Sequence, residues 1–172
     1  MSLRNLCLFG SCFNTPSLVP GAVSHTSPAS LCSGPSLYCP PRAASTDDQR
    51  KILKEYIDAV VTKKDILGGF CNHVTDDPPY IQHDPDMQPY GKRPTMEFLL
   101  NIPAYTDMNL TVLRFGIDDN LGWVHIVGCE SPEPGSCVQA ADIYRFEGTC
   151  IMEHWAVIQR EKTNKVNELS MW

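Results

Sequence analysis

The residues best suited to chemistry lie in one stretch, Val138 to Gln159, where ionisable side chains stand among apolar and aromatic ones. Apolar, β-branched and aromatic residues flank Glu147-Gly148-Thr149, which predicts two strands joined by a tight turn. Because side chains alternate along a strand, Asp142 and Tyr144 should share one face, and His154 should lie on one face of the partner. If both faces point to the same interior, a carboxyl and an imidazole occupy an apolar concavity, a setting typical of acid–base catalysts.

A purely structural interpretation of these residues is open as well. Asp142 could face solvent and pair with Arg145, and His154 could be a histidine of the core. Two more histidines are candidates for the same site. His83 follows a short extended piece in a Pro- and Asp-rich segment, where it could equally be a solvated loop residue, and His125 lies inside an expected strand.

Helices and then strands would position these groups. Thr46 and Gln49 predict a capping box at the start of an amphipathic helix that ends near Lys64. Shorter helices are expected at 65–72, capped by Asp65 and weakened by Gly68-Gly69, and at 93–101. Period-two patterns predict strands at 109–117, 121–130, 138–146 and 150–159. Helices followed by an antiparallel meander predict an α+β fold, with the helices on one face of a curved sheet.

Composition divides the chain into parts. Residues 1–45 contain no Asp or Glu and are rich in Pro, Ser and Cys, so we expect a disordered or loosely attached extension, followed by a folded domain at 46–160 and a polar tail at 161–172. The formal net charge of −6 argues against nucleic acid or an anionic membrane as a partner. We expect a cytoplasmic protein, although the extension leaves organelle or secretory targeting open.

The chain has eight cysteines, four of them in the extension and four in the expected domain. None forms a C-x-x-C pair, and no zinc-type spacing of Cys and His occurs. Disulfides would suit a secreted chain, but the scattered positions favour free, mostly buried thiols. We expect neither a metal nor a cofactor.

From Thr46 to Gln159 the chain resembles the SnoaL-like polyketide cyclases of the nuclear-transport-factor-2-like (NTF2-like) superfamily, which also contains ketosteroid isomerase and scytalone dehydratase. The resemblance is carried by EYIDAVVTKKD, YIQHDP, a GK-R helix start, VHI and ADIYRFEGTCIMEHWAVIQ, in this order. It implies a cone of curved antiparallel sheet packed on the N-terminal helices around an apolar pocket.

The resemblance also implies roles for residues. Asp142 matches the acid–base aspartate of the cyclases and His125 one of their pocket histidines. His83 falls where the isomerase keeps its carboxylate base, and Tyr56 falls where it keeps its oxyanion tyrosine. A substrate would contact Tyr56, Tyr144, His154 and Trp123. The chain departs from the pattern in two places, because an imidazole replaces the isomerase base and Ala156 replaces the usual aspartate after EHW.

The expected activity is that of a cofactor-free cyclase or isomerase that acts through an enolate on a polyketide-like or aromatic small molecule of secondary metabolism. His83 would remove the proton next to a carbonyl, and Asp142 would donate a hydrogen bond to the developing oxyanion. A dehydratase of the scytalone type is the alternative enzyme, and a non-catalytic module that binds a ligand or a protein is the alternative of another class. A homodimer across the open sheet face is common among proteins that the chain resembles.

Overall fold

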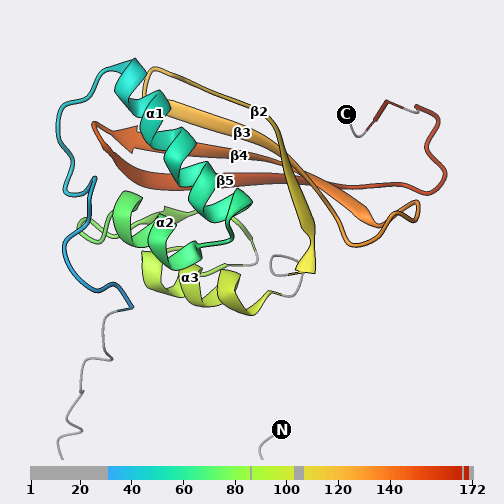
Figure 1. Cartoon of the computed structure of the whole chain (residues 1–172), viewed down its shortest axis with the longest axis horizontal. Helices are drawn as coiled ribbons and strands as arrows, with labels where there is room; N and C mark the ends of the chain where they lie inside the picture. The colour runs from blue at the N-terminus through green and yellow to red at the C-terminus, as the bar shows by residue number, and fades with distance from the viewer. Residues whose placement is uncertain (1–30, 86, 103–106, 168, 171–172) are drawn as a thin grey trace, which may run out of the picture.

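A computed structural model describes residues 31–85, 87–102, 107–167 and 169–170. The helices come first: α1 (Thr46–Ile57), the π-helix η1 (Asp58–Thr62), α2 (Ile66–His73) and, after the two-residue strand β1 (Ile81–Gln82), α3 (Lys92–Asn101). Four long strands follow, β2 (Asn109–Asp118), β3 (Leu121–Cys129), β4 (Cys137–Glu147) and β5 (Cys150–Arg160). The sheet order is β1-β5-β4-β3-β2, with β1 parallel to β5 and the other pairs antiparallel. The helices lie together on one face of the curved sheet (Figure 1), which confirms the expected α+β architecture.

The strand register divides the side chains into an inner and an outer face. Val124 lies opposite Asp142, and Ile126 lies opposite Ala140, so these four side chains share the face that α1 covers. Gly122 on the same face lets the sheet approach α1, because an added Cβ would stand 2.8 Å from Leu53 Cδ2. The core therefore forms between the inner face and the apolar stripe of α1.

A bulge in β5 changes one expected face. Arg145 pairs with Glu153 and Phe146 pairs with Ile151, so Met152 has no partner in the ladder. The bulge brings Ile151, rather than Met152, opposite Phe146 and into the core. Beyond the bulge the alternation is as predicted, and His154 lies opposite Tyr144.

The first helix is capped one residue earlier than predicted. Ser45, not Thr46, is the N-cap: its hydroxyl accepts the Asp48 N–H at 3.2 Å, and Asp48 Oδ2 accepts the Ser45 N–H at 3.2 Å. Gln49 is buried instead, and its Nε2 donates to Asn120 Oδ1 at 2.7 Å and to the Gly148 carbonyl at 2.9 Å. Gln49 thus ties the start of α1 to the turn between β2 and β3 and to the turn between β4 and β5.

Gly69 has a packing role that the sequence did not suggest. The chain from α1 continues into η1, and Val60 in η1 faces α2. A Cβ on Gly69 would lie 2.3 Å from Val60 Cγ2, so the two helical segments can approach this closely only because Gly69 has no side chain.

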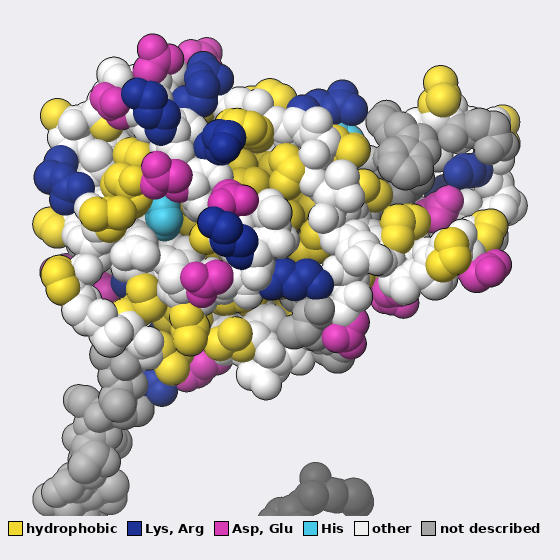
Figure 2. All heavy atoms as spheres, viewed as in Figure 1, with side chains coloured by type: hydrophobic (Ala, Val, Ile, Leu, Met, Phe, Trp, Pro, Cys, Tyr) yellow, Lys and Arg dark blue, Asp and Glu magenta, His cyan; other side chains and the backbone are white. Residues whose placement is uncertain are grey.

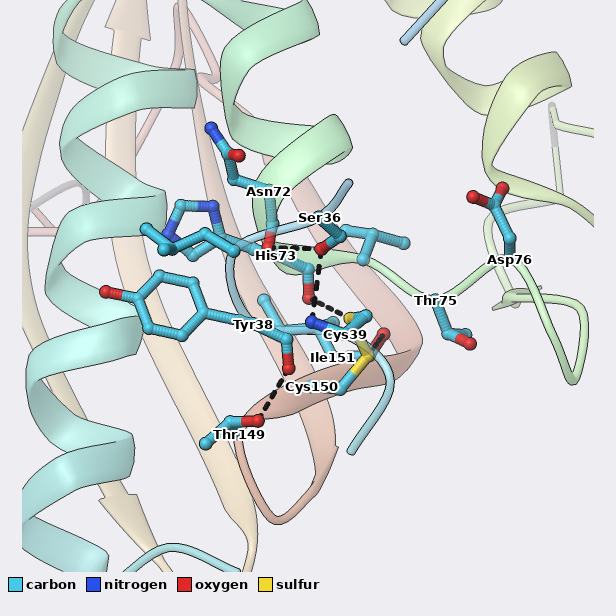
Figure 3. Close-up of a disulfide and its surroundings, with 12 residues drawn as sticks. Ser36, Tyr38, Cys39, Asn72, His73, Thr75, Asp76, Thr149, Cys150 and Ile151 are labelled. Carbon is cyan, nitrogen blue, oxygen red and sulfur yellow. Dashed lines mark hydrogen bonds between the residues drawn. A yellow bond between two sulfur atoms is a disulfide. The ribbon is translucent and has the colours of Figure 1, made fainter. Parts of the chain in front are cut away.

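Residues 31–45 are attached to the domain, contrary to the loose extension expected there, whereas residues 1–30 lie outside the described part of the chain. Two disulfides, Cys32–Cys71 and Cys39–Cys150, join this segment to α2 and to the start of β5. Hydrogen bonds accompany them, including Tyr38 N–H to the Asn72 carbonyl at 2.9 Å and the Thr149 hydroxyl to the Tyr38 carbonyl (Figure 3). We call residues 31–45 the strap.

A third disulfide, Cys129–Cys137, joins directly opposed residues of β3 and β4. The expectation of free thiols is therefore wrong for the six cysteines that the structure describes; Cys7 and Cys12 lie outside these residues. Scattered positions in the sequence concealed the pairs because the fold brings together residues up to 111 positions apart.

Residues 161–167 and 169–170 form no helix or strand, and they contact β4 and the loop before it. The Ser170 carbonyl accepts from Gln139 Nε2 at 3.1 Å, and Glu161 Oε2 accepts the Gly135 N–H at 2.9 Å.

None of the helices in the described ranges combines the length and apolar character that a bilayer crossing requires. On the face that Figure 2 shows, Lys and Arg side chains lie among Asp and Glu rather than in one block.

Candidate active site

A cavity of about 400 Å³ lies between the helices and the inner face of the sheet. This volume falls within the range of small-molecule sites. Most of its wall is apolar and includes Val60, Phe98, Leu99, Leu110, Ile126 and Ala140. Its polar lining includes Tyr56, Tyr80, Gln82, Asp84, Asp142, Tyr144 and His154. Few polar groups in a mostly apolar wall are typical of a pocket that binds and orients an organic molecule.

Asp142 and His154 are two ionisable side chains of this cavity that lie close together. They lie on the adjacent strands β4 and β5, and His154 Nε2 is 3.6 Å from Asp142 Oδ1. The Asp142 side chain is 17% exposed and that of His154 10%, and His154 Nε2 is shielded from solvent with no hydrogen-bond partner among the described residues. Both side chains line the cavity, and Asp142 is the more exposed of the two.

The other ring nitrogen of His154 is held by β1. His154 Nδ1 lies 2.8 Å from Gln82 Oε1, and the same oxygen accepts the backbone N–H of Asp84 at 3.1 Å. Gln82 is 4% exposed. The parallel pairing of β1 with β5, which sets Gln82 beside His154, is what brings the two side chains together.

Three tyrosines also line the cavity, together with Thr95, Glu130 and Arg160. The Tyr144 ring stacks on the His154 ring at 4.8 Å, and its hydroxyl lies 3.5 Å from Asp142 Oδ2. Tyr56 meets Tyr144 edge-on at 5.3 Å. Burial, reinforced by the charges of Asp142 and Glu153, raises the pKa of Tyr80 well above its usual value. Tyr80 therefore stays protonated and can act as a hydrogen-bond donor.

Four of the seven predicted site residues thus line one cavity: Tyr56, Asp142, Tyr144 and His154. The other three do not line it.

His83 lies outside the cavity, which corrects its expected role as the base. Its side chain is 40% exposed, its Nε2 is 2.7 Å from Glu153 Oε1, and its ring stacks on Trp155 at 4.7 Å. Glu153 also accepts from Arg145 Nε at 2.6 Å. Burial acts to raise the pKa of Glu153, but the hydrogen bonds from His83 and Arg145 outweigh it and leave that pKa below its usual value. Alternation along the chain sends His83 away from the side that its neighbours Gln82 and Asp84 share.

His125 and Trp123 lie on the outer face of the sheet, because their neighbours Val124 and Ile126 occupy the inner face. His125 Nε2 contacts Gln139 Oε1 at 2.8 Å. Trp123 is 43% exposed and covers Gly116 of β2, where an added Cβ would meet its ring at 2.8 Å. Neither residue is placed to contact a molecule in the cavity.

Sequence reasoning missed Gln82 and Asp84. A strand of two residues gives too short a pattern to show which side chains face inward. A signal for Asp84 did exist, since it is a carboxylate one residue after the position assigned to the isomerase base, and it is 9% exposed in the cavity wall.

No family model and no curated protein sequence matches the chain. Solved structures do match its fold. The crystal structure of a "putative ketosteroid isomerase" from Kribbella flavida DSM 17836 matches with a TM-score of 0.56 and 14% identity, over 72% of this chain and 87% of that one. An NTF2-like protein of unknown function from Burkholderia xenovorans LB400 matches with a TM-score of 0.54 and 11% identity, over 71% and 89%.

A "putative polyketide cyclase" from Acidithiobacillus ferrooxidans matches with a TM-score of 0.51 and 17% identity, over 65% of this chain and 88% of that one. These likenesses confirm the NTF2-like fold that the sequence predicted.

Proposed function

We propose that the chain is an acid–base enzyme that moves a proton on an apolar or aromatic, polyketide-like small molecule, with Asp142 as the group that contacts the reacting atoms. The observation that carries this proposal is the position of Asp142, a carboxyl in a mostly apolar cavity whose Oδ1 lies 3.6 Å from the His154 imidazole. A carboxyl so placed can exchange a proton with a carbon acid or an oxygen of the bound molecule.

His154 supports this proton exchange by balancing the charge of Asp142. When Asp142 is ionised, a protonated His154 balances its charge; when Asp142 takes up a proton, a neutral His154 leaves no unpaired charge in the cavity. The pair can thus hold one proton in two arrangements. This differs from the role first assigned to His83, which lies on the other side of the sheet.

Hydrogen-bond donors for a developing oxyanion are also present. The hydroxyl of Tyr80 stays protonated because burial raises its pKa, and Tyr56 and Tyr144 line the same cavity. A donor aimed at the oxygen of an enolate stabilises it more in a water-poor site than in solution. Proton removal next to a carbonyl, followed by ring closure or isomerisation, is the reaction class that this set of groups serves.

Exchange of hydrogen for deuterium tests the proposal without a known substrate. Cyclic aryl ketones and polyketide-like 1,3-dicarbonyl compounds in D₂O would be followed by ¹H NMR with and without protein. We expect catalysed exchange of the protons next to the carbonyl, reduced by about 100-fold or more in Asp142→Asn. Glu153→Gln is the matched control, since its carboxylate lies on the other face of the sheet.

The alternatives are separated by the same samples. Loss of 18 mass units from a hydroxylated probe, without exchange in the ketones, would favour a dehydratase. Binding of the probes with no exchange and no product, unchanged by Asp142→Asn, would favour a ligand-binding module. Asp84→Asn distinguishes a second carboxylate base from Asp142, because both line the cavity.

We also propose that the chain folds in an oxidising compartment rather than in the cytoplasm. Three disulfides support this, because cytosolic reductants keep most protein thiols reduced. Alkylation and peptide mapping of protein isolated from its natural source without reductant would test it. We expect the six described cysteines to be protected, and six alkylated thiols would refute the proposal.

The homodimer stays a proposal as well. Leu121, Trp123 and Val157 on the outer face of the sheet are 46%, 43% and 64% exposed, and a second copy could cover them. Sedimentation of the chain and of Val157→Glu would test this: a dimer that the substitution dissociates supports the proposal, and a monomeric parent refutes it.

A further inference from the structure

Gln82 lines the cavity beside His154, and the sequence analysis gave it no role in the site. Its Oε1 is shared by two groups, the backbone N–H of Asp84 at 3.1 Å and His154 Nδ1 at 2.8 Å. A backbone N–H can only donate, so the Gln82 atom that faces it must be the carbonyl oxygen and not the amide nitrogen. The backbone of Asp84 therefore fixes the orientation of the Gln82 amide.

This orientation determines where His154 carries its proton. A carbonyl oxygen can only accept, so His154 Nδ1 must be the donor in their 2.8 Å contact. The neutral ring then has its lone pair on Nε2, the atom that lies 3.6 Å from Asp142 Oδ1. A lone pair on Nε2 can accept a hydrogen bond from a protonated Asp142, and a second proton on Nε2 can be donated in a hydrogen bond to an ionised Asp142.

We infer that Gln82 is a positioning residue that holds neutral His154 in its Nδ1–H form, so that the imidazole and Asp142 share a single proton. The functional part of this inference rests on the proposed role of Asp142. Without Gln82, a neutral ring could carry its proton on Nε2 and donate a lasting hydrogen bond from there to the Asp142 carboxylate. The carboxylate would then be held ionised, and the pair would lose one of its two arrangements.

The chain contains a matched control for this arrangement. On the outer face, His125 Nε2 contacts Gln139 Oε1 at 2.8 Å, the same pair of residue types at the same distance. His125 does not line the cavity. Replacing Gln139 therefore removes a glutamine–histidine contact without touching the proposed site.

The ionisable groups that surround His154 must be considered in the test. Those that line the same cavity are Asp142 and Tyr144 on β4, Arg160 on β5, Glu130 directly after β3, Tyr80 and Asp84 on either side of β1, and Tyr56 on α1. A titration of His154 reports on all of them, so the comparison that decides is between variants at one pH and not between pH values in one protein.

The test is ¹⁵N NMR of the histidine rings in the full chain, which distinguishes Nδ1–H, Nε2–H and the doubly protonated ring. We expect Nδ1–H for neutral His154 in the parent, a shift towards Nε2–H in Gln82→Leu, and no change in Gln139→Leu. Gln82→Glu keeps the size of the side chain and an oxygen acceptor, so it should fold where Gln82→Leu fails to, and should increase the doubly protonated fraction of His154.

In the deuterium-exchange assay Gln82→Leu should lose about tenfold or more in rate, by analogy with residues that orient metal-binding histidines. An Nε2–H ring in the parent, or His154 spectra unchanged by either Gln82 variant, would overturn the inference. If the spectra behave as expected but the parent catalyses no exchange, the proposed function fails and the assignment of the proton to Nδ1 stands.

Discussion

The disulfide that should contribute most to stability is Cys39–Cys150, which closes a loop of 111 residues. A cross-link stabilises the fold by restricting the unfolded chain, and the chain-entropy relation gives about 4.8 kcal/mol for this loop length. The same relation gives about 3.9 kcal/mol for Cys32–Cys71 and about 2.5 kcal/mol for Cys129–Cys137, with separations of 39 and 8 residues. Loop length alone thus predicts the order of the three contributions.

The perturbation is Cys39→Ala, which breaks the bridge at its partly buried end and leaves Cys150, fully buried at 0% exposure, in place. Urea unfolding of the parent and the variant gives the free energy of unfolding and its dependence on urea. We expect a loss of about 3–5 kcal/mol, together with a steeper urea dependence because the unfolded chain exposes more surface. Hydrogen bonds between the strap and residues 72 and 149, present in both proteins, should keep the strap on the domain in the variant.

Cys129→Ala is the control, since its bridge closes the shortest loop and should cost least. An equal loss in both variants would refute the loop-length argument. An unchanged midpoint in Cys39→Ala would refute a stabilising bridge between Cys39 and Cys150.

Three further predictions follow from packing and charge. Burial lowers the pKa of His73 below 6.5, so as the pH falls from 7 towards 5 the unfolded chain binds a proton that the folded ring does not. The free energy of unfolding should therefore fall by at most about 1.4 kcal/mol per pH unit over this range. His73→Asn retains a donor for the Gly69 carbonyl and should remove this part of the pH dependence, measured by urea unfolding at each pH. Gly69→Ala should cost about 1–3 kcal/mol by thermal or urea unfolding, and Val60→Ala in the same chain should recover part of it if the 2.3 Å clash is the cause. Ser45→Ala should cost about 1 kcal/mol and Thr46→Ala much less, and equal losses would contradict the assigned cap.

Much of the fold could be predicted because its elements are long and regular. The four long strands carry period-two patterns, and their bounds agree with the predicted ones to within one or two residues. The strap could not be predicted, because neither alternation nor helical spacing reports contacts that connect residue 39 to residue 150. Its Pro and Ser content indicated disorder, and the two disulfides and the hydrogen bonds to Asn72 and Thr149 supply what an apolar core does not.

The site residues could be predicted where the alternation of side chains along a strand showed which face of the sheet each one occupies. Asp142 and His154 lie on long strands whose inner residues are apolar, so their side was apparent from their neighbours. His125 lies on a strand of the same kind, where the apolar residues at 124 and 126 already indicated that it faces the other way. His83 follows a strand of two residues, and there the resemblance to a family identified the position of a catalytic group but not which of two adjacent side chains reaches the cavity.

The alternation of side chains along the strands also explains why five polar residues of the cavity, Gln82, Asp84, Asp142, Tyr144 and His154, lie in contact with one another. Gln82 and Asp84 are two residues apart and lie on the cavity side, and the parallel register of β1 with β5 sets Gln82 beside His154. His154 in turn lies opposite Tyr144, two residues after Asp142 on the adjacent strand. A shift of one residue in the β1–β5 register would therefore bring His83 to the ring and remove the only acceptor that the described residues offer to His154 Nδ1. On this argument β1, the shortest strand of the sheet, is the element on which the protonation of the site depends.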